Sequence, residues 1–212
     1  MTNENIRRIM LNAYFETEQQ FIEITRLIPL DNSPDTYSPR LYDILQSLCG
    51  QVENLMRILC EKLNLEYENK NFPSYYKTLN QTGVLEFQII DLLNGSKAYI
   101  PFGIDKGKDT PNWWKGYNDT KHDLPNGYKQ GNLNNTTFAL TAVYALNCLF
   151  AYAEILGKDI LNKEKWIHVT GIGLNTRGLN ITTSESIGDM RPRSEILFPV
   201  SYFKGTGAEI WA

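Results

Sequence analysis

Apolar residues recur along the first third of the chain with the spacing of two long helices. Between residues 4 and 28 they return at alternating steps of four and three, the period of one stripe on a helix. A second stripe begins after Ser38-Pro39, a hydroxyl N-cap followed by a proline at the first helical position, where no N–H is needed. A short polar loop separates the stripes, so we expect an antiparallel helical hairpin. The stripes consist of Ile6, Met10, Ala13, Thr17, Phe21, Ile24 and Ile28, and of Leu41, Leu45, Leu48, Val52, Leu55, Leu59 and Leu63.

Three charged residues, Arg40, Glu53 and Arg57, lie near the second stripe. Charged side chains are usually exposed, so we interpret them as solvated residues at its flank. The alternative is that Glu53 or Arg57 reaches toward a later helix that carries His122.

The helical period breaks down between residues 69 and 110. Pro73-Ser-Tyr-Tyr is a start for a short helix, and the Asn94-Gly95 turn favours a small β-hairpin between 84–93 and 98–104. Residues 85–93 also fit one or two helical turns, because a short apolar run has no decisive period. A long helix, apolar nearly all round, then begins within residues 132–135 and stops at Gly157.

The sequence therefore predicts an all-α fold, an antiparallel helical bundle over residues 1–160. A small β-hairpin-like insertion interrupts it. The composition changes beyond residue 160, where Gly and Thr are frequent and only 166–170 and 196–203 are β-prone. We expect residues 161–212 to form an extended or partly β C-terminal tail, with those two segments as candidates for pairing.

The amino-acid composition limits which partners and which cellular compartment we expect for the protein. The net charge of −3 argues against a broad basic surface for duplex nucleic acid, although residues 97–131 hold six Lys against four Asp. We expect no secretory signal and no membrane span, since the apolar run 138–153 is shorter than the ~20 residues that a span needs. Cys49, Cys60 and Cys148 lie in apolar helical patterns, as buried reduced thiols of a cytoplasmic protein do.

The sequence lacks the common cofactor and metal motifs. Gly171-Ile-Gly173 is followed next by Gly178, which is the wrong spacing for a dinucleotide fingerprint, and no phosphate-binding Gly-rich loop with Lys-Ser/Thr is present. The two His and three Cys form no metal-ligand pair, and we interpret His168, alone in a β-prone segment, as structural. We therefore predict no cofactor and no metal.

The stretch from Pro111 to His122 concentrates polar side chains on one predicted helix. We expect Thr110 to cap it and Pro111 to be its first residue. Lys115, Asn118 and His122 then share one face, with Asn118 and His122 one turn apart and able to touch. We expect Trp113 and Trp114 to bury the adjoining flank.

These residue types suit RNA cleavage without a metal, in which the 2′-hydroxyl attacks the neighbouring phosphate. An imidazole gives or takes a proton near neutral pH, and Asn118 is placed to orient the ring of His122 or the group on which it acts. Lys115 and Lys121 supply positive charge for the phosphate or its transition state. The alternative is that Asn118 and His122 only cross-link the bundle by buried hydrogen bonds.

Residues 113–123, Trp-Trp-Lys-Gly-Tyr-Asn-Asp-Thr-Lys-His-Asp, resemble HEPN-like proteins, in which a Tyr-Asn-x-x-Lys-His helix precedes an Ala- and Leu-rich helix. Here that second helix is represented by Asn-Leu-Asn-Asn-Thr at 132–136 and Ala-Leu-Thr-Ala-Val-Tyr-Ala-Leu at 139–146. The resemblance covers residues 5–156, including Tyr-Ser-Pro-Arg at 37–40 and the helix with Glu53.

The resemblance implies an all-α bundle that often forms homodimers, in a family with many metal-independent endoribonucleases of toxin–antitoxin, abortive-infection and phage-defence systems. Asn118 matches the family's polar position and His122 its histidine. The family's arginine is not matched, because Tyr117 precedes Asn118 and Lys115 is the nearest cation at acceptable spacing.

Two hypotheses follow. In the first, the protein is a ribonuclease-type defence or toxin protein with His122, Asn118 and Lys115 as catalytic residues, Lys121 and Tyr117 binding substrate, and RNA and an antitoxin or other protein as partners. In the second, it is a non-catalytic HEPN-like module that binds RNA, a nucleotide or a partner protein. A purely structural helical protein is the third class.

Overall fold

The computed structural model describes most of the helical part of the chain and a few strands beside it. The described residues are 3–28, 33–86, 89–91, 97–105, 108–162, 166–168, 194, 197–199 and 201–203. The helices are α1 (Asn3–Thr25), α2 (Pro39–Lys62), α3 (Phe72–Thr82), α4 (Asn112–His122), α5 (Leu124–Gly127) and α6 (Leu133–Leu156), with 3₁₀ turns η1 (Tyr128–Gln130) and η2 (Gly157–Leu161). Helix dominates these residues, in agreement with the predicted all-α class.

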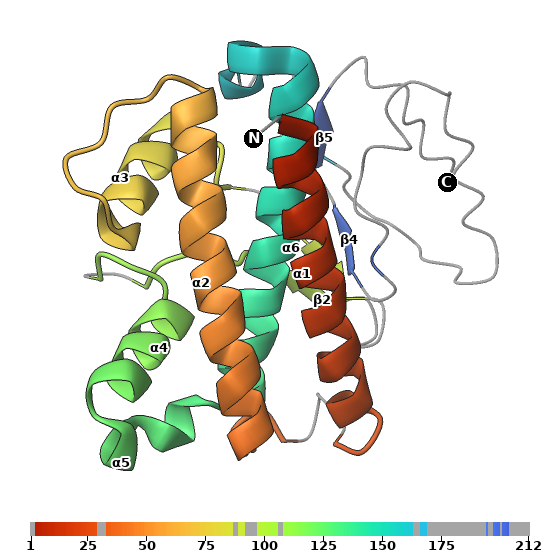
Figure 1. The fold of residues 1–212 in the computed structure, drawn as a ribbon, viewed down its shortest axis with the longest axis vertical. Helices are drawn as coiled ribbons and strands as arrows, with labels where there is room; N and C mark the ends of the chain where they lie inside the picture. The colour runs from red at the N-terminus through yellow and green to blue at the C-terminus, as the bar shows by residue number, and fades with distance from the viewer. Residues whose placement is uncertain are drawn as a thin grey trace.

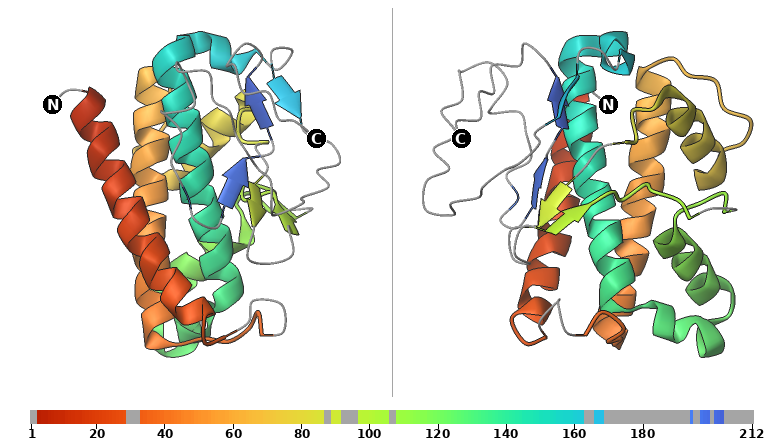
Figure 2. Two further views of the ribbon diagram at one scale, coloured as in Figure 1. Left: turned by 90° about the vertical axis from the view of Figure 1, so that its right-hand side faces the viewer. Right: turned by 180° about the vertical axis from the view of Figure 1, so that it is seen from behind.

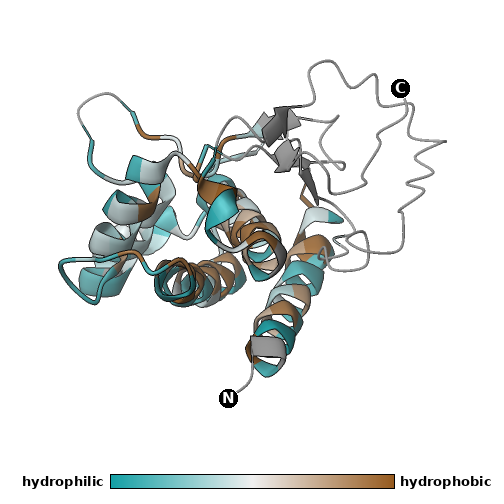
Figure 3. Ribbon diagram, turned by 90° about the horizontal axis from the view of Figure 1, so that it is seen from above, coloured by the Kyte–Doolittle hydropathy of each residue, from teal (hydrophilic) through white to brown (hydrophobic). Residues whose placement is uncertain are grey.

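The three long helices α1, α2 and α6 form the body of the fold, with α1 antiparallel to the other two (Figure 1). The most extensive contact is between α2 and α6. Every residue of the predicted stripe from Leu41 to Leu63 is at most 1% exposed, so the seven-residue repeat is confirmed as the core-facing side of α2. The α1 stripe faces the same core but is only partly buried at Ile6 and Met10. Seen end-on, the hydrophobic positions gather on the long helices (Figure 3).

α6 is the central helix. It is long and apolar enough to cross a membrane by length and composition, but 94% of its apolar window is buried inside the fold, as in the core helix of a soluble protein. Its ends are as predicted. The Asn132 side chain caps the start by accepting a hydrogen bond from the backbone N of Asn135 at 2.9 Å, and Gly157, with φ of 53°, ends the helix.

The predicted cap of α2 is confirmed and the predicted cap of α4 is wrong. Ser38 Oγ accepts a hydrogen bond from the backbone N of Leu41 at 3.1 Å. At α4, Pro111 rather than Thr110 occupies the N-cap position and makes no side-chain cap bond. Pro111 has an extended ψ of 147°, so the first helical residue is Asn112.

Short strands lie beside the bundle (Figure 2). β1 (Ile89–Asp91) pairs antiparallel with β2 (Lys97–Tyr99) and with β4 (Leu197–Pro199), while β3 (Trp166–His168) pairs with β5 (Ser201–Phe203). The Asn94-Gly95 turn and residues 169–193 of the tail lie outside the described residues. The tight hairpin turn and the division at residue 160 therefore stay predictions.

The three cysteines are buried free thiols, as predicted. Burial raises the pKa of the Cys49 thiol well above its usual value, and burial together with nearby Glu61 raises that of Cys60 to about 12. Both thiols are protonated at neutral pH, and a nucleophilic cysteine needs the thiolate. Neither is therefore suited to catalysis.

Candidate functional site

Two tryptophans fasten α4 to the rest of the fold. Trp113 and Trp114 are 2% and 4% exposed, which confirms that they bury one flank of the helix. Trp113 Nε1 donates a hydrogen bond to the carbonyl O of Pro101 at 2.6 Å, and Trp114 stacks on Phe72 of α3 with ring centroids 3.6 Å apart. Burial of two large aromatic side chains fixes which face of α4 is left for solvent.

The outer face of α4 contributes to an open pocket of about 330 Å³. Asn118 and His122, the two residues predicted one turn apart, both line it. Its other lining residues come from α4 and the segment that follows: Asp119, Asp123, Gly127 and Gln130. The structure therefore brings the predicted Asn–His pair to one concave surface.

Asn118 and His122 do not cross-link the bundle. Asn118 is half-buried and His122 is exposed. Within the described part of the chain neither side chain makes a hydrogen bond, to the other or to a third residue. Their polar atoms are thus free to bind a ligand in the pocket, which weakens the purely structural interpretation of the pair.

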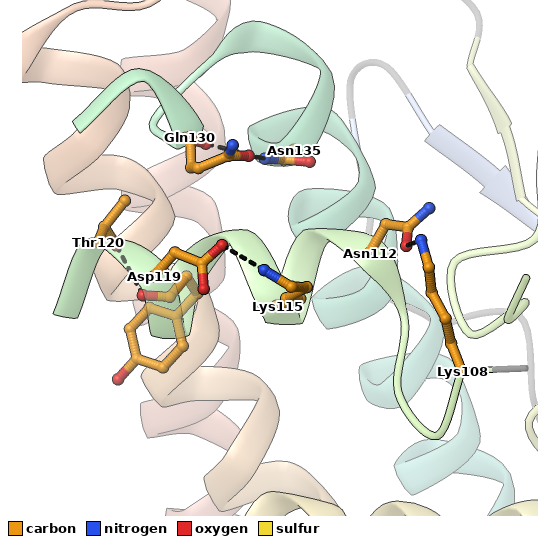
Figure 4. A network of polar contacts seen from close by, with 8 residues as sticks. Lys108, Asn112, Lys115, Asp119, Thr120, Gln130 and Asn135 are labelled. Carbon is orange, nitrogen blue, oxygen red and sulfur yellow. Dashed lines mark hydrogen bonds and ion pairs between the residues drawn. The ribbon is translucent and has the colours of Figure 1, made fainter. Parts of the chain in front are cut away.

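Lys115, predicted to share the face of Asn118 and His122, is not among the residues that line the pocket. Its Nζ is 2.6 Å from Asp119 Oδ2, in an exposed ion pair between residues one helical turn apart (Figure 4). Asp119 lines the pocket, so the pair holds the lysine charge next to it. The pair also neutralises part of that charge, and Asp123 adds a second carboxylate to the lining.

Tyr117 and Lys121, the predicted substrate-binding residues, lie outside the pocket lining. Tyr117 is 9% exposed, and its burial, with smaller effects from Cys49, Glu53 and Tyr42, raises the pKa of its hydroxyl. Lys121 Nζ lies 5.7 Å from the centroid of the Tyr117 ring. The two residues form a cation–π pair on the neighbouring side of α4.

The side chains of Glu53 and Arg57 in α2 are bonded to residues outside α4. Glu53 Oε1 accepts a hydrogen bond from the backbone N of Phe72 at 3.0 Å, and Arg57 pairs with Glu61 at 2.9 Å. Glu53 therefore binds the first backbone N–H of α3 while lying near enough to Tyr117 of α4 to raise the pKa of that hydroxyl, and Arg57 is a flank residue, as predicted.

The wall of the pocket formed by Gly127 and Gln130 was not predicted from the sequence. The sequence of residues 123–127 indicates only a break after α4, whereas Leu124–Gly127 is the one-turn helix α5, folded back onto α4. An ideal Cβ on Gly127 would lie 2.4 Å from the carbonyl O of Asp119, so only glycine permits this approach. The i,i+4 spacing of Asp119 to Lys115 indicates that the two residues pair beside the site, but no local sequence signal indicates that Gln130 lines the pocket.

The Gln130 side of the pocket is tied to the start of α6. Asn135 Nδ2 donates hydrogen bonds to the backbone O of Gln130 at 2.9 Å and to its Oε1 at 3.2 Å (Figure 4). Within the described residues the Gln130 side chain makes no other hydrogen bond, so its amide NH₂ can donate to a ligand.

Replacing Gly127 with alanine is expected to destabilise the protein by about 1–3 kcal/mol, because a methyl group would force α5 away from α4. Urea unfolding measures this, with Gly50→Ala as the control, since a Cβ on Gly50 of α2 meets nothing within 4 Å. Gly50→Ala should be neutral or stabilising, because alanine favours helix. Equal stability of Gly127→Ala and wild type would contradict the close packing of α5 on α4.

Among the described residues, no three His, Cys, Asp or Glu side chains converge to hold a metal ion. The pocket offers instead an imidazole, two amides and two carboxylates, a set suited to proton transfer and to hydrogen bonding with a polar ligand. Comparisons of the chain with protein families, curated proteins and solved structures found no match.

Proposed function

We propose that this chain is a HEPN-like protein that cleaves single-stranded RNA without a metal ion, using His122 as the acid/base. The observation that carries the proposal is that Asn118 and His122 line one pocket while neither side chain makes a hydrogen bond within the described residues. An imidazole so placed meets the first requirement of a general acid/base, which is a position from which it can reach the substrate.

The reaction follows from these groups. The 2′-oxygen bonds to phosphorus as the bond from phosphorus to the 5′-oxygen breaks. His122 takes the proton of the 2′-hydroxyl or gives one to the departing 5′-oxygen, water handles the other proton transfer, and Asn118 orients the imidazole or the phosphate. Lys115, held beside the pocket by Asp119, stabilises negative charge that develops on the phosphate. Lys121, on the flank of α4, contacts a more distant phosphate.

The biological setting is part of the proposal and rests on the resemblance of residues 113–123 to HEPN-like proteins. We place the protein in the cytoplasm, as a homodimer, in a toxin–antitoxin or phage-defence system with a cognate partner protein. Its bundle of long helices suits this family.

A second candidate function is a non-catalytic HEPN-like module that binds RNA, a nucleotide or a partner protein. Two observations favour it. Tyr117, largely buried, stands where the family's arginine is expected, and Lys115 shares its charge with Asp119. A lysine in an exposed pair lacks the planar fork with which arginine grips a phosphate.

The experiment incubates purified protein with unstructured RNA in EDTA. The proposed function predicts fragments with 2′,3′-cyclic phosphate ends, formed roughly tenfold more slowly by Lys115→Ala, since an exposed cation contributes less than a buried donor. Lys77→Ala is the matched control, because Lys77 is also in an exposed ion pair, with Glu68 at 2.8 Å. RNA binding without fragments would favour the non-catalytic module.

A further inference from the structure

Three tyrosines form an aromatic cluster on the same end of the bundle as the pocket. Tyr37 precedes α2, Tyr42 lies in the first turns of α2, and Tyr128 begins η1. The Tyr37 and Tyr128 ring centroids are 5.9 Å apart at 86°, and those of Tyr42 and Tyr128 are 6.0 Å apart. Lys129 Nζ lies 6.0 Å from the centroid of the Tyr37 ring.

This cluster is at the surface and does not belong to the core. Tyr37 is 44% exposed, and Tyr42 and Tyr128 are each only half-buried. A single exposed aromatic needs no explanation, but three in contact beside a lysine form a surface that can bind a flat ligand.

The backbone under the cluster is firmly held. Leu133 N donates a hydrogen bond to the carbonyl O of Thr36 at 2.8 Å, and Tyr37 pairs with Asn132 in an isolated β-bridge. An ideal Cβ on Gly131 would lie 2.8 Å from the Cα of Tyr42, so η1 also packs closely on α2. A rigid aromatic surface loses little conformational entropy when a ligand stacks on it.

The cluster adjoins the pocket through η1. Tyr128 belongs to the cluster and Lys129 lies beside it, and the next residue, Gln130, lines the pocket. The cluster and the pocket are therefore joined by one 3₁₀ turn.

We propose that the cluster of Tyr37, Tyr42 and Tyr128 stacks an unpaired base of single-stranded RNA, whose phosphate contacts Lys129. This proposal rests on the proposed function and adds how the substrate is held. Aromatic side chains stack on bases of any identity, since every base has a π-face, and a lysine beside the ring suits the attached phosphate.

The charged residues near the cluster give little general attraction for phosphates, so stacking on the rings is the main source of affinity. Asp35 and Asp43 are exposed on the same segment, and Arg40 pairs with Glu23. Few cations are thus left beside the cluster, where Lys129 is the one proposed phosphate contact, so the cluster should contribute only roughly −0.7 to the slope of log affinity against log salt concentration.

The test measures binding of a fluorescent, unstructured 2′-O-methyl RNA to the full chain by anisotropy. This RNA lacks the attacking 2′-hydroxyl, so binding is separated from cleavage. Tyr37→Ala should weaken binding about tenfold, and Tyr37→Phe should bind as wild type because it keeps the ring. Tyr67→Ala is the control, since Tyr67 packs edge-on against Tyr75 beyond the opposite end of α2.

The outcomes separate the two proposals. Wild-type binding that is unchanged in Tyr37→Ala, or equally lost in Tyr37→Phe, would overturn stacking and leave the proposed ribonuclease function intact. Absence of both binding and cleavage by the wild type would overturn both. Circular dichroism checks that each variant is folded.

Discussion

Replacement of His122 with alanine is expected to slow RNA cleavage by about 10²–10⁴-fold, the usual contribution of a general acid or base. The effect should be on chemistry and not on folding. The His122 side chain is exposed and makes no hydrogen bond within the described residues, so its removal should change the free energy of unfolding by less than about 0.5 kcal/mol.

Single-turnover cleavage in EDTA, with thermal unfolding of the same samples, measures both effects. His168→Ala is the control, because His168 is the other histidine of the chain and lies in β3, away from α4 in the sequence. Equal cleavage by wild type and His122→Ala would show that His122 is not the acid/base. Lost stability with no change of activity would support the purely structural class.

The largest expected loss of stability is for Phe72→Ala, about 3–5 kcal/mol. Phe72 is fully buried and joins α3 to α4 through its stack on Trp114, and it also stacks on Tyr76 of its own helix at 5.6 Å. Removing the ring leaves a cavity beside Trp114, and Trp113 cannot shift into it without breaking its hydrogen bond to Pro101.

Chemical denaturation of Phe72→Ala beside Phe72→Leu measures this loss. Leucine retains much of the apolar volume and should cost less than alanine, whereas both variants keep the backbone N–H that donates to Glu53. A loss below about 1 kcal/mol in Phe72→Ala would contradict the role of this stack in fastening α4.

The helical core could be predicted from the sequence because helix periodicity directly encodes burial. The α2 stripe and the buried Trp113–Trp114 flank follow from residue spacing alone. The same helix geometry explains why Tyr117 is buried. Consecutive residues of a helix are rotated by about 100° around its axis, so Tyr117, the neighbour of Asn118, points into the core instead of the pocket.

The pocket wall could not be predicted, since it depends on contacts between segments. Gly127 reads as a turn residue, and its role appears only when α5 lies against the backbone of Asp119. Gln130 lines the pocket because Asn135 of α6 holds it there. The pairing of β1 with β4, more than a hundred residues away, has no local signal either.

The most direct test of the site is NMR of the histidine side chains during titration with unstructured 2′-O-methyl RNA. The chain has two histidines, so His122→Ala assigns both signals. A ligand in the α4–α5 pocket should shift the His122 signal and the Asn118 side-chain amide and leave His168 unchanged. RNA binding that shifts neither His122 nor Asn118 would contradict the assignment of this pocket as the functional site.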